Sequence, residues 1–358
     1  MKAKRVAVIP GDGIGTEVAV AAVEVLEKAA EIYGIPLDFV WFDLGAERYL
    51  REGVSMPQPV FEDLRDHYDA IFLGALGDPR VPDQQHAHDI LLGLRTRLDL
   101  YINLRPVKLL HPRLTPLRDK GPEHLDFVIF RENTEGLYVG IGGTFKRDTP
   151  EEVAINEMVT TRIGVERIIR AAFSYAVERG LRRVCMADKA NVLRHAHGLW
   201  QRVFKLVAAE YPQIEARHLY ADVLAMELVR APEDFQVIVT SNMFGDLLSD
   251  LAAQLVGGLG LAPSGNLHPG RVGLFEPVHG SAPPLAGKDV ANPFAMILTG
   301  ALMLEQLGYP AAGADIEQAV RACLVEGAAT RDLGGSLGTR AAGAAVAAHL
   351  GAGQPAQA

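Results

Sequence analysis

Three arginines in this sequence each follow a short apolar run, where a guanidinium would reach the edge of a protein core. Arg95 follows LLGL, Arg105 follows YINL and Arg131 follows FVIF. A guanidinium is a planar fork that binds a carboxylate through two parallel hydrogen bonds, so three converging forks would suit a dicarboxylate. Taken singly, each arginine is better explained as half of a surface ion pair, worth only ~0–1 kcal/mol.

Two aspartates lie four residues apart in the segment GDLLSDLAAQL. On a helix this spacing places Asp246 and Asp250 on one face. The buried side of that helix is predicted to contain Leu247, Leu248, Leu251 and Leu255. Neighbouring carboxylates repel unless a cation or water compensates them, and Mg²⁺ or Mn²⁺ would leave coordination positions open to substrate oxygens. A solvated acidic face at a helix start explains the pair equally well.

Two further residues are candidates for moving protons. Lys189, in ADKAN, follows a predicted strand beside Asp188, where it could serve as a base oriented by Asn191 or form a loop ion pair. Tyr138, seven residues after Arg131, is a candidate proton donor or a packing residue.

Glycine-rich segments could meet a nucleotide. Residues 275–283 (FEPVHGSAP) and 291–293 (ANP) could present backbone amides and an imidazole to such a ligand, although the signal is weak alone. Gly11, Gly13 and Gly15 follow a strand and precede a helix, but their spacing is G-x-G-x-G and not G-x-G-x-x-G. We therefore expect a tight turn near a ligand and not a Rossmann dinucleotide fold.

The elements that must position these residues alternate along the chain. Strands are predicted at Arg5–Ile9, Ala70–Leu73, Phe127–Phe130, Val184–Ala187 and Val237–Thr240. Helices are predicted at Glu17–Tyr33 and Arg162–Glu178, the second with Ile163, Ile169, Phe173 and Ala176 on its apolar stripe and Gly180 as its stop. Strands separated by helices indicate an α/β protein with a largely parallel sheet. A hairpin-like excursion is predicted at residues 138–156, and a disordered tail is predicted at residues 351–358.

Composition bounds the class of protein. The chain has 358 residues, 49% hydrophobic and 22% charged, which suits a soluble enzyme of two domains. A net charge of -9 argues against a general nucleic-acid binder. Cys185 and Cys323 stand alone in apolar surroundings and are predicted to be buried, inert thiols in a reducing cytosol. No apolar run approaches the ~20 residues of a membrane helix, so we expect a cytoplasmic protein.

Taken together, the segments resemble the β-decarboxylating dehydrogenases, the family of isocitrate and isopropylmalate dehydrogenases. LRTRLDLYINLRP, RENTEGLY, DKANVL, NMFGDLLSDLAA, and FEPVHGSAP with ANP occur in the family's order across nearly the whole chain. The resemblance implies an α/β, two-domain fold with a shared mixed sheet, unlike Rossmann's. It places residues 1–102 and 256–350 in a first domain on the cofactor side, and residues 103–255 in a second domain. An arm of the second domain, near residues 138–156, would be exchanged between the subunits of a homodimer.

The resemblance also implies roles for individual positions. Arg95, Arg105 and Arg131 would hold the substrate carboxylates, with Leu91 and Leu92 beside them. Asp246 and Asp250 would bind the metal with Asp222 from the partner subunit, which would also supply Lys189 as the base. Tyr138 would protonate the enolate left by decarboxylation. The residues implied at the NAD site are Ile14, Glu276, His279, Gly280, Ser281, Ala282, Ala291, Asn292 and Asp332.

The expected reaction is an NAD- and Mg²⁺- or Mn²⁺-dependent oxidative decarboxylation of a 2-hydroxy dicarboxylate. The Leu91–Leu92 pair beside Arg95 favours the alkyl branch of 3-isopropylmalate, a substrate of leucine biosynthesis. The main alternative substrate is D-malate or tartrate, and homoisocitrate or isocitrate is a less favoured alternative. NAD-using relatives carry an aspartate immediately after HGSAP, whereas this chain has Pro284, so we expect a weakened preference for NAD over NADP.

Overall fold

The computed structural model describes residues 3–351, which divide into two compact units. The first unit runs through Leu100, resumes at Leu109–Pro122 and continues from Ala253 onward, and the second comprises Tyr101–Lys108 and Glu123–Ala252. The segment 109–122 therefore belongs to the first unit, although we expected it in the second. The remainder of the predicted tail, 352–358, lies outside the described residues, and Gly351 N donates to Asp315 Oδ2 at 2.9 Å.

The first unit is an α/β structure built on mostly parallel strands. Its strands are β1 (Lys4–Gly11), β2 (Leu37–Trp41), β3 (Ala70–Ala75), β11 (Pro263–Leu267) and β12 (Gly273–Pro277). Its helices are α1 (Gly15–Tyr33), α2 (Ala46–Glu52), α3 (Gln58–His67), α4 (Gln85–Ala87), α5 (Gly93–Arg97), α10 (Phe294–Gln306), α11 (Pro310–Glu326) and α12 (Thr339–His349). The strand order is β2-β1-β3-β12-β11, and only β11 runs antiparallel to its neighbour β12.

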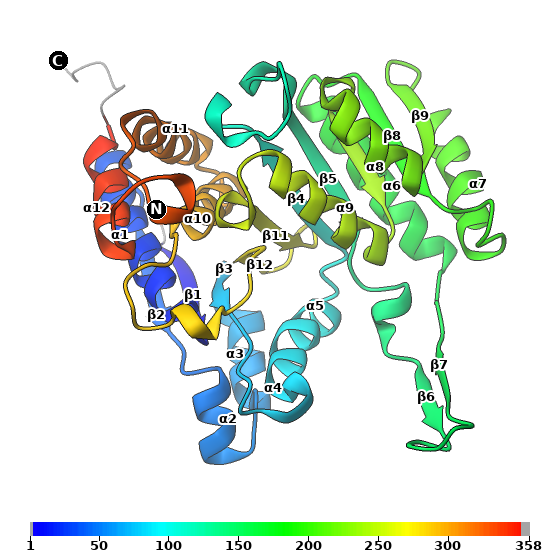
Figure 1. Cartoon of the computed structure of the whole chain (residues 1–358), viewed down its shortest axis with the longest axis horizontal. Helices are drawn as coiled ribbons and strands as arrows, with labels where there is room; N and C mark the ends of the chain where they lie inside the picture. Colours follow the sequence, from blue (N-terminus) through cyan, green and yellow to red (C-terminus); the bar gives the residue numbers. More distant parts are fainter. Residues whose placement is uncertain (1–2, 352–358) are drawn as a thin grey trace. The chain divides into compact units, whose positions relative to one another are not determined.

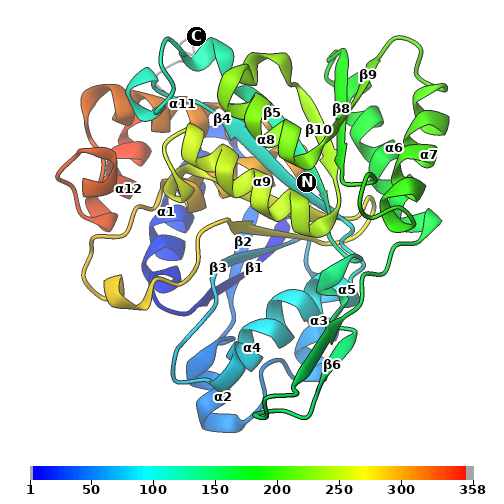
Figure 2. The same ribbon diagram turned by 45° about the vertical axis from the view of Figure 1, so that its right-hand side comes forward.

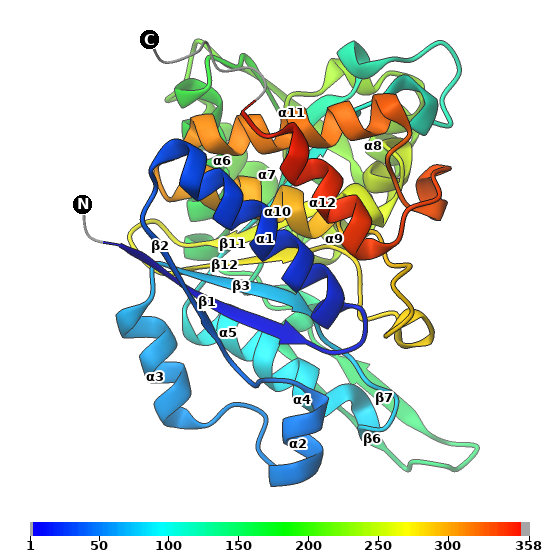
Figure 3. The same cartoon turned by 90° about the vertical axis from the view of Figure 1, so that its left-hand side faces the viewer.

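Helices cover both faces of these strands. Figure 3 shows α1, α10, α11 and α12 on one side of β1, β3 and β12, with α2, α3, α4 and α5 on the other. Every residue of β3 is buried, and Val6–Ile9 of β1 are fully buried, as expected for parallel strands covered on both faces.

The second unit repeats this plan around a second set of strands. They are β4 (Ile102–Lys108), β5 (Asp126–Glu132), β8 (Arg183–Asp188), β9 (Glu215–Tyr220) and β10 (Val237–Thr240), with the hairpin strands β6 (Gly142–Phe145) and β7 (Val153–Asn156). Its helices are α6 (Arg162–Glu178), α7 (Ala196–Ala208), α8 (Ala221–Arg230) and α9 (Asn242–Leu255). The order is β4-β5-β10-β8-β9, antiparallel only between β4 and β5.

Within this unit, α8 and α9 lie in front of β4, β5 and β10 in the view of Figure 2. The antiparallel hairpin β6–β7 projects away from the other strands and helices of the unit (Figure 1). The predicted excursion at 138–156 is therefore confirmed as a hairpin.

Two apolar residues lie on the opposite side from that predicted. Ile163 is 77% exposed, because it lies about 120° around α6 from the stripe of Ile169, Phe173 and Ala176. Leu247 is 61% exposed, because it shares the i, i+3, i+7 stripe of α9 with the exposed residues Asp250 and Gln254.

The tight turn between β1 and α1 explains the G-x-G-x-G spacing. Gly11 and Gly13 have φ of 72° and 54°, a region that favours glycine. A Cβ on Gly11 would lie 1.9 Å from Ala75 O, and one on Gly13 would lie 2.1 Å from Ser281 O. The glycines therefore let neighbouring backbone segments approach the turn, in agreement with the rejection of a Rossmann motif.

Both cysteines are buried, as predicted. Burial raises the pKa of the Cys185 thiol to about 12 and that of Cys323 to about 11. Among residues 3–351, no helix is long and apolar enough to cross a membrane.

Candidate active site

Strand pairing brings two of the predicted arginines to one face of the second unit. Arg105 on β4 and Asn103, two residues earlier, point to the same side of the strand, and Asn103 pairs with Arg131 on β5. Arg105 is 6% exposed and Arg131 is 2% exposed. Buried guanidinium groups require hydrogen-bonding partners, so their surroundings determine what they can bind.

Neutral side chains orient both guanidinium groups. Arg105 Nε donates to Asn103 Oδ1 at 2.7 Å, and its Nη1 donates to Ser249 Oγ at 2.5 Å. Arg131 Nε donates to Asn242 Oδ1 at 2.9 Å. These contacts hold the guanidinium planes in fixed orientations.

The acid pair of α9 faces these arginines. Asp246 accepts a hydrogen bond from Arg131 Nη1, and its Oδ1 lies 3.3 Å from Arg105 Nη2. Asp250 Oδ1 lies 3.4 Å from Arg105 Nη1. Tyr138 donates its hydroxyl to Asp246 Oδ2 at 3.0 Å. Four predicted residues, Arg105, Arg131, Asp246 and Tyr138, thus form one hydrogen-bonded cluster, with Asp250 at its more exposed side.

The cluster shifts the ionisation of two of its members. Burial, followed by the charge of Asp246, raises the pKa of Tyr138 above its ordinary value of 10.0, and a phenol is protonated at neutral pH with or without this shift. Burial also raises the pKa of Asp250, against the opposing effect of Arg105. A protonated phenol beside a carboxylate and two guanidinium groups can donate a proton to a bound anion.

Asp246 and Asp250 offer hard oxygen ligands from one helix face, which suits Mg²⁺ or Mn²⁺. Among the described residues, no group of three histidine, cysteine, aspartate or glutamate side chains could hold a metal ion. The third predicted ligand, Asp222, instead lies in the first turn of α8 and pairs with Lys189, with 2.6 Å between Nζ and Oδ1. The hydrogen bond from Lys189 lowers the pKa of Asp222. One chain thus offers two carboxylates on this helix face, and Mg²⁺ commonly binds one or two carboxylates together with water and substrate oxygens.

Arg95 lies in the first unit, in α5, and is 7% exposed. Its Nη2 donates to Glu276 Oε1 at 2.7 Å, and Glu276 also accepts from Asn266 Nδ2 at 2.9 Å. Arg95 Nε is buried without a hydrogen-bond partner, a donor that a ligand could satisfy. Leu91 and Leu92 precede Arg95 in a half-buried π-helical turn, His88–Leu92. The convergence of Arg95 with the other two arginines stays a prediction.

The predicted dinucleotide residues lie in the first unit, Glu276 on β12 and the others on turns and loops. Ile14 N donates to Ser281 O at 2.8 Å, which joins the β1–α1 turn to the loop after β12. Asn292 Nδ2 donates to Asp332 Oδ2 at 2.9 Å. Ala282 has a φ of 39°, Ala291 is buried and Gly280 is exposed.

An unsatisfied histidine indicates that this loop region can accept a ligand. His279 Nε2 is buried without a hydrogen-bond partner, and burial lowers the pKa of its imidazole, so the ring is neutral. A neutral imidazole next to the backbone amides of Gly280 and Ser281 fits a nucleotide, so the residues present are compatible with NAD.

Sequence reasoning missed the residues that orient the arginines, namely Asn103, Asn242 and Ser249. Asn103 could have been found from its two-residue offset to Arg105 on a strand. The other two carried no signal, because their bonds to Arg131 and Arg105 join positions more than a hundred residues apart in sequence.

Known proteins share this architecture. The family model described as isocitrate/isopropylmalate dehydrogenase matches residues 5–346. The 3-isopropylmalate dehydrogenase of Thermobifida fusca is 48% identical, over 90% of this chain and 91% of the relative, and that of Streptomyces griseus is 46% identical, over 94% and 98%. The crystal structure of isocitrate dehydrogenase from Methylococcus capsulatus superposes with a TM-score of 0.87 at 37% identity, covering 97% of this chain and 99% of that one. These likenesses confirm the predicted fold class.

Proposed function

This chain belongs to the isocitrate/isopropylmalate dehydrogenase family, and from that premise we propose that it oxidises and decarboxylates 3-isopropylmalate with NAD and Mg²⁺ or Mn²⁺. The reaction is a step of leucine biosynthesis. One observation carries the proposal: buried Arg105 and Arg131 face the carboxylates of Asp246 and Asp250, with the Tyr138 hydroxyl bonded to Asp246.

The cluster accounts for substrate binding. Arg105 and Arg131 are already oriented by neutral partners, so binding a carboxylate costs them little rearrangement. In the free protein Asp246 compensates their charge. A bound substrate carboxylate takes over that compensation, and Asp246 is then available to a cation.

Proton transfer is assigned to two residues. Lys189, from the partner subunit, would accept the proton of the substrate hydroxyl in its neutral form, and NAD when bound would supply the hydride acceptor. Asp246 and Asp250 would hold the divalent metal, which supplies polarisation of the new ketone oxygen so that carbon dioxide can depart. Tyr138 then donates its proton to the resulting enolate, a role that its place beside Asp246 supports.

A matrix of steady-state rates tests the substrate and cofactor. NADH or NADPH formation is followed for 3-isopropylmalate, D-malate, tartrate, isocitrate and homoisocitrate, with and without a metal chelator. We expect the highest kcat/KM for 3-isopropylmalate and loss of turnover with chelator. A kcat/KM for D-malate above that for 3-isopropylmalate would overturn the substrate assignment.

The same matrix tests the effect of Pro284, which is exposed in a short 3-10 turn and offers no side-chain acceptor to a ribose. We expect a retained but reduced preference for NAD. Equal kcat/KM values for NAD and NADP would show that discrimination is lost altogether.

We also propose that the chain acts as a homodimer in which Lys189 and Asp222 complete the partner's site. The hairpin supports this, because its apolar residues Ile141, Phe145, Val153 and Ile155 are 47–67% exposed. Met226 on α8 and Leu247 on α9 are 62% and 61% exposed, an apolar surface that a partner could cover.

A further inference from the structure

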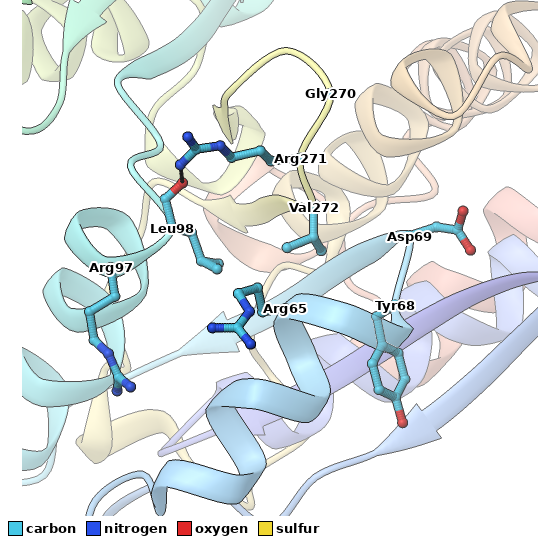
Figure 4. Close-up of a pocket in the computed structure, with 8 residues that line it drawn as sticks. All are labelled: Arg65, Tyr68, Asp69, Arg97, Leu98, Gly270, Arg271 and Val272. Carbon is cyan, nitrogen blue, oxygen red and sulfur yellow. Dashed lines mark hydrogen bonds between the residues drawn. The ribbon is translucent and has the colours of Figure 1, made fainter.

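A cavity of about 530 Å³ opens in the first unit, away from the residues of the candidate active site. Figure 4 shows its lining, which consists of Arg65, Tyr68, Asp69, Arg97, Leu98, Gly270, Arg271 and Val272. Asp69 precedes β3 and Val272 precedes β12, so the cavity lies where these strands begin. The proposed dinucleotide loop follows the opposite end of β12. The two sites are therefore separate.

The floor of the cavity is apolar and firmly packed. Leu98 is 2% exposed, Val272 7% and Tyr68 8%, and all three belong to one core cluster with Phe61 and Leu64. A floor of this kind gives a ligand an apolar contact surface that does not collapse when the ligand leaves.

Three arginines form the rim, and hydrogen bonds or ring stacking hold each of them. Arg65 binds Asp66 through Nε and Nη2, both at 2.7 Å. Arg271 Nη1 donates to Leu98 O at 3.1 Å, as Figure 4 shows. Arg97 donates to the amide of Gln58 and stacks on Phe61, with its guanidinium carbon 3.5 Å from the ring centroid.

Arginines outnumber acids among the residues that line the cavity, within a chain of net charge -9. Asp66 compensates the charge of Arg65, and Asp99 Oδ2 lies 3.9 Å from Arg271 Nη1. The lining includes one acid, Asp69, which accepts from Lys4 Nζ at 2.9 Å and points away from the arginines in Figure 4. The contacts of Arg97 are to a neutral amide and a ring, and they leave its charge uncompensated. Guanidinium forks match the geometry of phosphate and carboxylate oxygens.

We propose that this cavity binds a small organic anion with at least two oxyanion groups, either phosphates or carboxylates. The oxyanion groups would contact Arg65, Arg97 and Arg271, and the carbon skeleton would lie on Leu98 and Val272. The volume is within the 300–1,000 Å³ range typical of small-molecule sites and exceeds the needs of one inorganic ion.

Isothermal titration calorimetry tests the proposal with two probes, pyrophosphate for the phosphate class and 1,3,5-benzenetricarboxylate for the carboxylate class. Both titrations use protein stripped of metal and then dialysed free of chelator, and each is repeated with Arg105→Gln, so that any contribution of the Arg105–Arg131 cluster is measured. We expect saturable binding of at least one probe, and the probe that binds more tightly identifies the class.

Variants locate the binding. In Arg65→Gln and Arg271→Gln, made singly and together, the dissociation constant of that probe should rise roughly tenfold to hundredfold per arginine. Arg51→Gln is the matched control, because Arg51 is also an exposed, aspartate-paired arginine of the first unit, and its effect should stay below about twofold. Thermal unfolding verifies that each variant is folded.

Two results would overturn the proposal. One is the absence of saturable binding of either probe to the native protein. The other is equal affinity of the native protein and the folded Arg65→Gln or Arg271→Gln variants, which would place the anion elsewhere. Neither result depends on catalysis, so the proposed function would be unaffected.

Discussion

At the residue scale, the free protein uses one carboxylate to compensate two buried guanidinium groups. Asp246 contacts both Arg105 and Arg131, whereas Asp250 touches the cluster from its exposed side. The two acids are equivalent as predicted metal ligands, but they differ in what else they support. That difference separates the structural from the chemical contribution of each acid.

We therefore predict different consequences for Asp246→Asn and Asp250→Asn. Both should lower metal-dependent turnover by at least about 100-fold, because each removes a charged ligand at a developing negative charge. Asp246→Asn should also destabilise the protein by about 1–3 kcal/mol, because it leaves buried guanidinium charge uncompensated. Asp250→Asn should lower the free energy of unfolding by less than about 1 kcal/mol, because the side chain of Asp250 is 52% exposed.

Turnover assays and urea unfolding of the two variants check this prediction. Matching losses of stability would show that Asp246 does not compensate the arginines. Undiminished activity of Asp250→Asn would remove it from the metal site.

The sequence predicted the charged members of this cluster but not the neutral residues that orient them. The arginines and aspartates could be identified from the sequence because each is a charged residue next to an apolar run, a pattern that is unusual for an ordinary surface residue. Asn242 and Ser249 became meaningful only when β4, β5 and α9 were placed side by side, and nothing local to either residue indicates its long-range bond.

At the element scale, the long strands and helices were predicted well, because buried parallel strands and amphipathic helices have distinct periodicities. Val237–Thr240 and Arg162–Glu178 agree with the structure at both ends. The exposed positions of Ile163 and Leu247 were not predicted, because hydrophobicity alone does not distinguish a buried position on a helix from an exposed one.

The hairpin gives a prediction at this scale. An isolated two-stranded hairpin is marginally stable in water, so β6–β7 with its exposed apolar residues should pack against a second copy of the chain. Phe145→Glu combined with Ile155→Glu should weaken the dimer and reduce turnover, because Lys189 and Asp222 would no longer reach the partner's site.

Sedimentation velocity across a concentration series measures this effect. Val325→Glu is the control, since Val325 on α11 has the same 67% exposure as Phe145 but lies in the first unit. A native protein that sediments as a monomer at every concentration would contradict the prediction.

At the scale of the whole molecule, each unit buries its own core around mostly parallel strands. The boundary at 109–122 could not be predicted, because this segment has no regular periodicity and its place is set by contacts such as Arg113 Nη2 to Leu324 O at 3.1 Å. Global stability also depends on polar groups that these cores enclose.

His197 is such a group, and it predicts a dependence of stability on pH. It is 1% exposed, its Nδ1 accepts from Lys189 N at 2.9 Å, and burial lowers the pKa of its imidazole despite the opposing charge of Asp188. Above the ordinary pKa of 6.5 the imidazole is neutral in both states, so it contributes nothing. Below it the unfolded chain binds a proton that the folded protein excludes, so the free energy of unfolding should fall with decreasing pH.

Urea unfolding at neutral and mildly acidic pH measures this dependence. In His197→Gln, the slope should be smaller than in the native protein by up to about 1.4 kcal/mol per pH unit. His279 also has a lowered pKa and should maintain part of the slope. Identical slopes in the two proteins would contradict the assignment.

The most direct test of the central claim is a crystal structure with Mn²⁺ and 3-isopropylmalate, with the metal located by its anomalous scattering. The account predicts an anomalous peak within coordination distance of Asp246 and Asp250, and a substrate carboxylate bound by the guanidinium groups of Arg105 and Arg131. A fully occupied manganese ion bound elsewhere, with Asp246 still held by both arginines, would contradict it.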